Sequence, residues 1–159
     1  MIKQSECAAT FGNPSSPGWE ATHLVRVVPP YHMHMGDVTI KSFLFNKIAA
    51  PQLLQALNQI WDKCGHDDNH VEALGADVFS GTFAIRTMRG LKTTSMHAYG
   101  LAADLNAPEN PLGRAPADNP RGFHAGGIVV TAFLDAGAVW GGSWARRPDP
   151  MHFQWAVVG

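Results

Sequence analysis

The sequence predicts a small α+β domain in which helices flank a mixed, mostly antiparallel sheet. Short runs rich in β-branched and aromatic residues indicate strands, and two stripes of apolar residues at helical spacing indicate helices. These elements do not alternate in the βαβ order of a parallel sheet. Of the 159 residues, 45% are hydrophobic and 16% are charged, a composition typical of a compact globular protein. We therefore expect residues 1–159 to form a single domain with a buried core.

The N-terminal half is predicted to contain an irregular arm, two strands and the clearest helix of the chain. Residues 1–20 hold two glycines and two prolines, and we expect them to form the arm. Residues 24–28, which precede two prolines, and residues 38–45 are the strand candidates. The helix begins near Pro51 and ends at Gly65. Its apolar stripe consists of Leu53, Leu57, Ile60 and Cys64.

The C-terminal half is predicted to consist of loops, one helix and short strands. The polar stretch 65–75 and the proline-rich stretch 107–122 are expected to be loops, and a long loop retained in a compact domain usually has a function. Apolar residues recur at helical spacing over residues 128–136, and Gly137 ends that helix. The expected strands are residues 82–86, 101–105, 139–140 and 152–158.

Composition argues against several classes of partner. The formal net charge is −1 and Arg146-Arg147 is the only adjacent basic pair, so we expect no nucleic-acid partner. No apolar run approaches the roughly 18 residues that span a bilayer, so we expect no stable membrane insertion. The first residues lack the basic start and apolar stretch of a secretory signal, which predicts synthesis in the cytoplasm.

The two cysteines do not form a metal-binding pair, because Cys7 and Cys64 are far apart in sequence. Cys64 continues the apolar stripe of the first helix, and we interpret it as a buried, reduced thiol. A single disulfide between the two cysteines stays open at this stage.

Residues 95–106 (SMHAYGLAADLN) place His97 and Asp104 seven positions apart. One continuous helix would put both on the same face, but Gly100 favours a turn that leads into a strand, which would also bring them together. Asp104 lies among apolar neighbours, and a buried carboxylate needs a partner or a metal ion. For either residue alone, a buried salt bridge or a core histidine is the better interpretation.

A second histidine, His152, lies in a run (MHFQWAVV) that is predicted to enter the core as a strand. Asp149 precedes it by three residues, and Pro150 favours an extended or turn conformation at Asp149. Two imidazoles, one carboxylate and a further acid are the residue types of a hydrolytic zinc centre, which has three protein ligands, an open position for water and a separate base. By spacing alone, a zinc site and a hydrogen-bonded core histidine are equally supported.

Other histidines also occur in pairs. His32 and His34 would share a face of a strand, and His66 and His70 would share a face of a helix. Both pairs lack an apolar frame and a third ligand. We interpret all four as solvated polar residues.

Two segments resemble a known family. SMHAYGLAADLN resembles the S-x-H-x-x-G-x-A-x-D signature of the D-Ala-D-Ala carboxypeptidase family of zinc peptidases. Residues 140–155 (WGGSWARRPDPMHFQW) resemble the closing W-G-G-x-W…D-x-x-H-F block of its L-alanyl-D-glutamate peptidase branch, which includes many phage endolysins. Arg86 before the first segment, and Asn106 and Asn110 after it, fit the same pattern. The resemblance covers residues 86–155.

The resemblance implies a set of site residues. It implies one zinc ion bound by His97, Asp104 and His152, and a base at Asp149. It also implies that Arg86 steadies the substrate carbonyl and that Ser95 lies beside the substrate. The implied fold is the small α+β fold shared with hedgehog signalling domains. The chain departs from the branch at Ser143, where the branch often has Asp, and at Gln154, where an acid frequently follows His-Phe.

The implied activity is zinc-dependent hydrolysis of the peptide stem of bacterial peptidoglycan. The leading expectation is an L-alanyl-D-glutamate endopeptidase acting as an endolysin, a monomer that reaches the cell wall after release from the cytoplasm. The alternative is a D-Ala-D-Ala carboxypeptidase or dipeptidase. A third hypothesis, from a different class, is a non-catalytic binding module that zinc stabilises. Asp149 and Arg86 argue against that module, because a purely structural zinc site needs neither residue.

Overall fold

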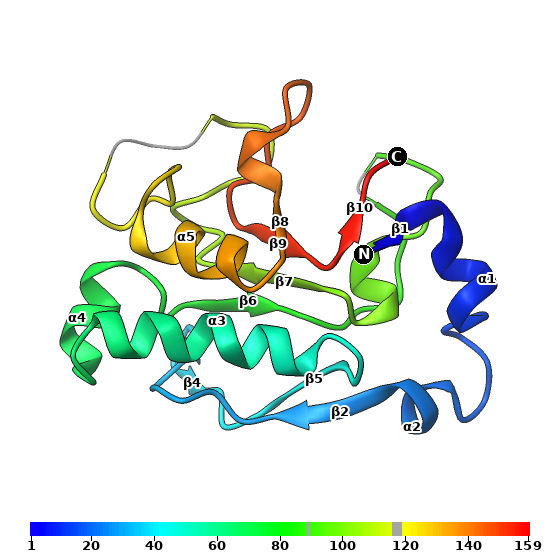
Figure 1. The fold of residues 1–159 in the computed structure, drawn as a ribbon, viewed down its shortest axis with the longest axis horizontal. Coiled ribbons are helices and arrows are strands. Elements are labelled where there is room, and N and C mark those ends of the chain that lie inside the picture. The colour runs from blue at the N-terminus through cyan, green and yellow to red at the C-terminus, as the bar shows by residue number, and fades with distance from the viewer. Residues whose placement is uncertain (89, 116–118) are drawn as a thin grey trace.

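A four-stranded antiparallel sheet lies at the centre of the fold. The structure is a computed structural model that describes residues 1–88, 90–115 and 119–159. The strands lie in the spatial order β6 (Phe79–Gly81), β7 (Ala102–Leu105), β9 (His152–Gln154) and β8 (Val139–Trp140). Helices flank this sheet and smaller strand pairs complete the molecule, so the chain has an α+β fold, as the sequence predicts (Figure 1).

The two longest helices among the described residues form the core with this sheet. Helix α3 (Ala50–Lys63) packs against helix α5 (Ile128–Asp135), and both were expected from their apolar stripes. Phe133 of α5 stacks on Phe153 of β9, with ring centroids 4.0 Å apart. The predicted stripe on α3 is buried: Leu53, Leu57, Ile60 and Cys64. Aromatic packing against α5 therefore holds β9 in place.

Two predicted strands are each divided between different sheets. Residues 38–45 contain β4 (Val38–Thr39), which pairs with β3 (His34–Met35), and most of β5 (Phe43–Asn46), which pairs with β2 (Leu24–Val27). Residues 152–158 likewise divide at Trp155 into β9 and β10 (Ala156–Val157). Strand β10 pairs in parallel with β1 (Ile2–Lys3). An apolar run predicts that a segment is extended, but it does not identify the segment's partner.

The expectation of an irregular arm over residues 1–20 was wrong. Besides β1, this segment contains the short 3-10 helix η1 (Gln4–Glu6), helix α1 (Cys7–Phe11) and the start of helix α2 (Trp19–His23). The Trp19 indole donates a hydrogen bond to the carbonyl of Phe11 at 2.6 Å, and both side chains are buried. The glycines and prolines are confined to residues 12–18, the link between the two helices.

Two further predictions need correction in the central part of the chain. Residues 65–75 are not only a loop, because helix α4 (Asp68–Ala73) forms where the Asp67 side chain accepts a hydrogen bond from the amide of Asn69. Residues 82–86 belong to no strand, and the strand lies just before them as β6. The stretch 107–122 is a loop as expected, without helix or strand over its described residues 107–115 and 119–122.

Cys7 and Cys64 are free thiols in the structure, and Cys64 is buried, as its place in the apolar stripe predicts. Burial raises the pKa of the Cys7 thiol to about 11. None of the helices over the described parts of the chain has the length and hydrophobicity needed to cross a bilayer.

Candidate metal centre

A tight turn brings His97 close to Asp104. His97 lies in the 3-10 helix η2 (Met96–Tyr99), which begins where the Ser95 hydroxyl accepts a hydrogen bond from the His97 amide at 3.3 Å. Gly100 then adopts φ +64°, and the chain enters β7. A Cβ atom at Gly100 would lie 2.7 Å from the Leu24 side chain and 3.0 Å from the Asn46 amide nitrogen. Only glycine fits here, and the predicted turn into a strand is present.

Strand pairing brings the third residue to the same place. Asp104 of β7 lies directly opposite His152 of β9 in the antiparallel ladder. Directly opposite residues project their side chains from the same face of a sheet. The sheet register therefore places a carboxylate beside an imidazole from 48 residues further along the chain.

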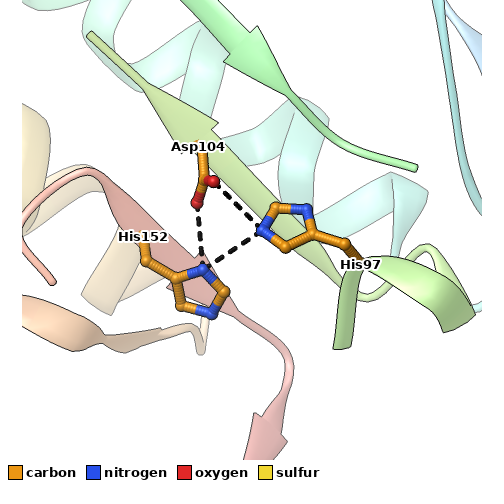
Figure 2. Close-up of side chains that lie close together, drawn as sticks. All are labelled: His97, Asp104 and His152. Carbon is orange, nitrogen blue, oxygen red and sulfur yellow. Dashed lines mark hydrogen bonds and ion pairs between the residues drawn. The ribbon is translucent and has the colours of Figure 1, made fainter. Parts of the chain in front are cut away.

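The three side chains converge on one point, as Figure 2 shows. Asp104 Oδ1 lies 2.9 Å from His152 Nδ1, and Asp104 Oδ2 lies 3.2 Å from His97 Nε2. The two ring nitrogens are 3.3 Å apart. Ligands of a tetrahedral zinc ion, at about 2.0–2.1 Å from the metal, are about 3.3 Å from one another. The spacing and the donor types of the cluster therefore fit a zinc ion.

The tautomer of His97 also fits a metal site. Its Nδ1 lies 2.9 Å from the carbonyl oxygen of Thr82, which can only accept a hydrogen bond, so Nδ1 donates. In the neutral ring Nε2 then carries a lone pair directed at the cluster. A carbonyl that fixes the tautomer of a metal-binding histidine in this way is a common arrangement.

The electrostatics of the cluster keep Asp104 ionised. Burial by itself would raise the pKa of Asp104, but hydrogen bonds and charge from His152 and His97 bring it below its usual range. For His152, burial acts to lower the pKa, but the hydrogen bond and charge of Asp104 outweigh it and raise the pKa. The cluster thus combines two imidazoles with the buried negative charge of Asp104. A positive charge, from a metal ion or from a proton on an imidazole, is needed to compensate it.

Asp149 lies in the same pocket without joining the cluster. Its amide donates to the carbonyl of Gly141 at 2.9 Å, and its own carbonyl accepts from the His152 amide at 3.0 Å. Its Oδ1 is buried and has no hydrogen-bond partner within the part of the chain that the structure describes. Burial raises the pKa of this carboxyl, with the nearby charge of Asp104 acting in the same direction. A carboxylate oxygen that lies near the cluster, with no hydrogen-bond partner among the described residues, is suited to accept a proton.

The pocket has a volume of about 700 Å³ and brings together all six residues singled out in the sequence. The cluster forms part of its wall, with Asp149, Arg86 and Ser95 around it. Arg86 lies in the segment that follows β6, and its carbonyl accepts a hydrogen bond from the Ser95 amide at 3.1 Å. The pocket can therefore hold a ligand close to the three-residue cluster, the Asp149 carboxyl group and the Arg86 guanidinium group.

Three contributors to the centre were missed by sequence reasoning. The Thr82 carbonyl left no signal, because a backbone acceptor can belong to any residue type. Trp144, whose ring centroid lies 5.5 Å from that of His152, is the second tryptophan of the W-G-G-x-W block and was detectable there. Gln154, considered only as a departure from a motif, accepts a hydrogen bond from His152.

The two histidine pairs of the sequence analysis are not part of the cluster. Their members were predicted to be solvated, and this is wrong for His34. His34 is half-buried and donates a hydrogen bond from Nε2 to Asp77 at 2.8 Å. This hydrogen bond raises the pKa of His34. The other three, His32, His66 and His70, are exposed as expected.

Comparison with known proteins finds a family match over the segment that contains this cluster. A profile of the family described as D-alanyl-D-alanine carboxypeptidase matches residues 89–155, which is less than half of the chain. The matched segment contains His97, Asp104, Asp149 and His152 and excludes Arg86. No curated protein and no solved structure matches the chain. The similarity therefore coincides with the part of the chain that builds the cluster.

Proposed function

We propose that this chain is a zinc peptidase that hydrolyses the peptide stem of bacterial peptidoglycan. The observation that carries the proposal is the convergence of His97, Asp104 and His152 in a pocket that also holds Asp149, whose buried Oδ1 has no hydrogen-bond partner among the described residues. The segment that builds this arrangement is similar to a family of peptidases, and the donor set fits zinc.

In the proposed mechanism each residue of the pocket has a separate task. His97, Asp104 and His152 would hold a zinc ion, and such an ion would supply a water with a pKa of about 7 and a positive charge close to the substrate carbonyl. Asp149 accepts the proton of the attacking water and passes it to the leaving amine. Arg86 stabilises the negative charge that develops on the substrate carbonyl oxygen. Ser95, at the start of η2, lies beside the substrate.

The bond that we propose is L-Ala–D-Glu, cut internally, as in phage endolysins. The support for it is the W-G-G-x-W…D-x-x-H-F block of residues 140–155, which folds around Asp149 and His152. A second candidate, removal of a C-terminal D-Ala, is favoured by the description of the family that matches residues 89–155. A non-catalytic zinc module is disfavoured, because Asp149 has a buried oxygen in the same pocket with no hydrogen-bond partner in the described parts of the chain.

Digestion of purified cell walls by the zinc-loaded protein tests the proposal. We expect muropeptides with new amino-terminal D-Glu, identified by mass spectrometry after amino-group labelling. Release of free D-Ala or D-Ala-D-Ala would replace the L-Ala–D-Glu assignment by the second candidate. A zinc-loaded protein that produces neither kind of terminus from walls of several chemotypes would contradict the peptidase proposal.

A further inference from the structure

We propose that Gln154 is a positioning residue of the metal centre and that Gln4 holds it in place. Gln154 would fix the ring of His152 so that Nδ1, and not Nε2, faces the metal. This inference rests on the proposed function, because it assumes that the cluster binds a metal ion. It adds the N-terminal segment, which lies outside the matched residues 89–155, to the parts of the chain that build the centre.

The side-chain amide of Gln154 has only one orientation that satisfies its surroundings. Gln154 lies in β9, between β7 and β8, and is 2% exposed. Its Nε2 donates a hydrogen bond to the carbonyl oxygen of Ala156, which can only accept. The second N–H of the same group points to Gln4 Oε1, at 3.0 Å. With both N–H groups used in this way, the amide oxygen must face the opposite direction.

That direction is the ring of His152. Gln154 Oε1 lies 2.9 Å from His152 Nε2. Because an amide oxygen can only accept, Nε2 must carry the proton, and in the neutral ring Nδ1 keeps the lone pair. His152 Nδ1 is the atom that lies 2.9 Å from Asp104 and 3.3 Å from His97.

The two imidazoles are thus held as opposite tautomers by two different acceptors. The Thr82 carbonyl fixes His97 with Nε2 free, and the Gln154 amide fixes His152 with Nδ1 free. Losing either acceptor allows its ring to present a protonated nitrogen to the metal. Partners of metal-binding histidines typically contribute about 10–100-fold to metal affinity.

Gln4 reaches Gln154 because the two ends of the described chain are paired. Strand β1 pairs with β10, with Ile2 opposite Ala156, and Gln4 follows directly after β1. The pairing therefore fixes the positions of both groups that accept from Gln154, the Ala156 carbonyl and the Gln4 side chain. Gln4 also lines the pocket that contains the cluster. Removing its side chain should loosen Gln154 without removing the acceptor of His152.

Zinc affinity, measured by competition with a chromophoric chelator, tests the inference on the full chain. Gln154→Met keeps the length of the side chain and removes the acceptor, so we expect zinc to bind about 10–100-fold more weakly. Gln154→Glu keeps an acceptor for the His152 N–H but loses the donor to the Ala156 carbonyl, so it should bind zinc more tightly than Gln154→Met does. Gln59→Met is the matched control, because Gln59 donates to Asp135 on the protein surface, and its zinc affinity should not change.

The tautomers of the histidine rings can be measured directly, and a general loss of stability would not change them. In zinc-loaded wild type, ¹⁵N spectra of the histidine rings should show one ring bound through Nε2 and one through Nδ1. Gln154→Met should lose the signature of the ring bound through Nδ1. A wild-type spectrum with both rings bound through Nε2 would overturn the inference.

Two results separate this inference from the proposed function. A wild-type protein that binds no zinc overturns both. A wild-type protein that binds zinc, together with a folded Gln154→Met of equal affinity, overturns only the role of Gln154. If Gln154→Met does not fold, Gln4→Met decides, because Gln4 is only half-buried: weaker zinc binding supports the inference and unchanged binding overturns it.

Discussion

At the scale of single residues, the centre depends on carboxylates with opposite surroundings. Asp104 lies 2.9 Å from a ring nitrogen of His152 and 3.2 Å from a ring nitrogen of His97, and its pKa lies below the usual range. Asp149 has a buried oxygen without a partner among the described residues, and burial raises its pKa. Two carboxyl groups in one pocket whose environments separate their pKa values in this way usually have different roles. Asp104 is suited to bind a cation, and Asp149 to exchange a proton.

The substitution Asp149→Asn separates these roles. The amide side chain has nearly the same shape as the carboxylate but cannot accept a proton, so we expect zinc content to stay at the wild-type level. Turnover should fall by about 10²–10⁴, the usual contribution of a general base. Zinc content by elemental analysis and the rate of muropeptide release measure the two effects. Turnover close to the wild-type rate would remove Asp149 from the mechanism.

At the scale of elements, the turn between η2 and β7 sets the distance from His97 to Asp104. Gly100 forms this turn with φ +64°, against the Leu24 side chain and the Asn46 backbone. Gly65, at the end of α3, has nearly the same φ of +65°, but a Cβ atom there would have no neighbouring atom within 4 Å. Both glycines have a positive φ, but only Gly100 has no room for a Cβ atom.

Alanine substitution at these two positions should therefore have different effects. Gly65→Ala should lower the free energy of unfolding by about 1–2 kcal/mol, the cost of a left-handed backbone for a residue with a Cβ atom. Gly100→Ala carries the same cost and a steric clash, so its loss should be larger and zinc affinity should fall with it. Urea denaturation of both variants measures the difference. Equal losses and unchanged zinc affinity would contradict the role assigned to Gly100.

Some elements were predictable from sequence because their signals are local. The stripe of α3 and the helix over residues 128–136 needed only helical periodicity, and His97, Asp104 and His152 lie in compact motifs. Strand partners were not predictable, because pairs such as β1–β10 join residues from opposite ends of the chain. For the same reason, the contact of the Thr82 carbonyl with His97 and the contact of Gln4 with Gln154 were not predictable. Both form only when distant segments of the chain come together.

At the scale of the whole molecule, the cluster joins segments that are separate in sequence. His97 lies in η2, Asp104 lies in β7 and His152 lies in β9 (Figure 2). A metal ion held by all three would bind only the folded chain. Ligands of this kind stabilise a protein by mass action, by about 2.7 kcal/mol at a free concentration one hundred times the dissociation constant.

Chelation should therefore lower the thermal stability of the entire chain. For a protein of this length, a loss of about 2.7 kcal/mol corresponds to a decrease of roughly 5–10 °C in Tm. Differential scanning calorimetry with and without a chelator measures the decrease, and added zinc should reverse it. His97→Ala is the control, and its Tm should not respond to the chelator. An identical response in that variant would show that the ion acts elsewhere.

The parallel pairing of β1 with β10 has a practical consequence for fusion proteins. Figure 1 shows the two ends of the described chain close together, and Gln4 and Val158 both line the pocket. A purification tag or a second folded domain joined at either end would begin close to residues that line the pocket. Such a fusion can obstruct the pocket even though it leaves every residue of the chain unchanged.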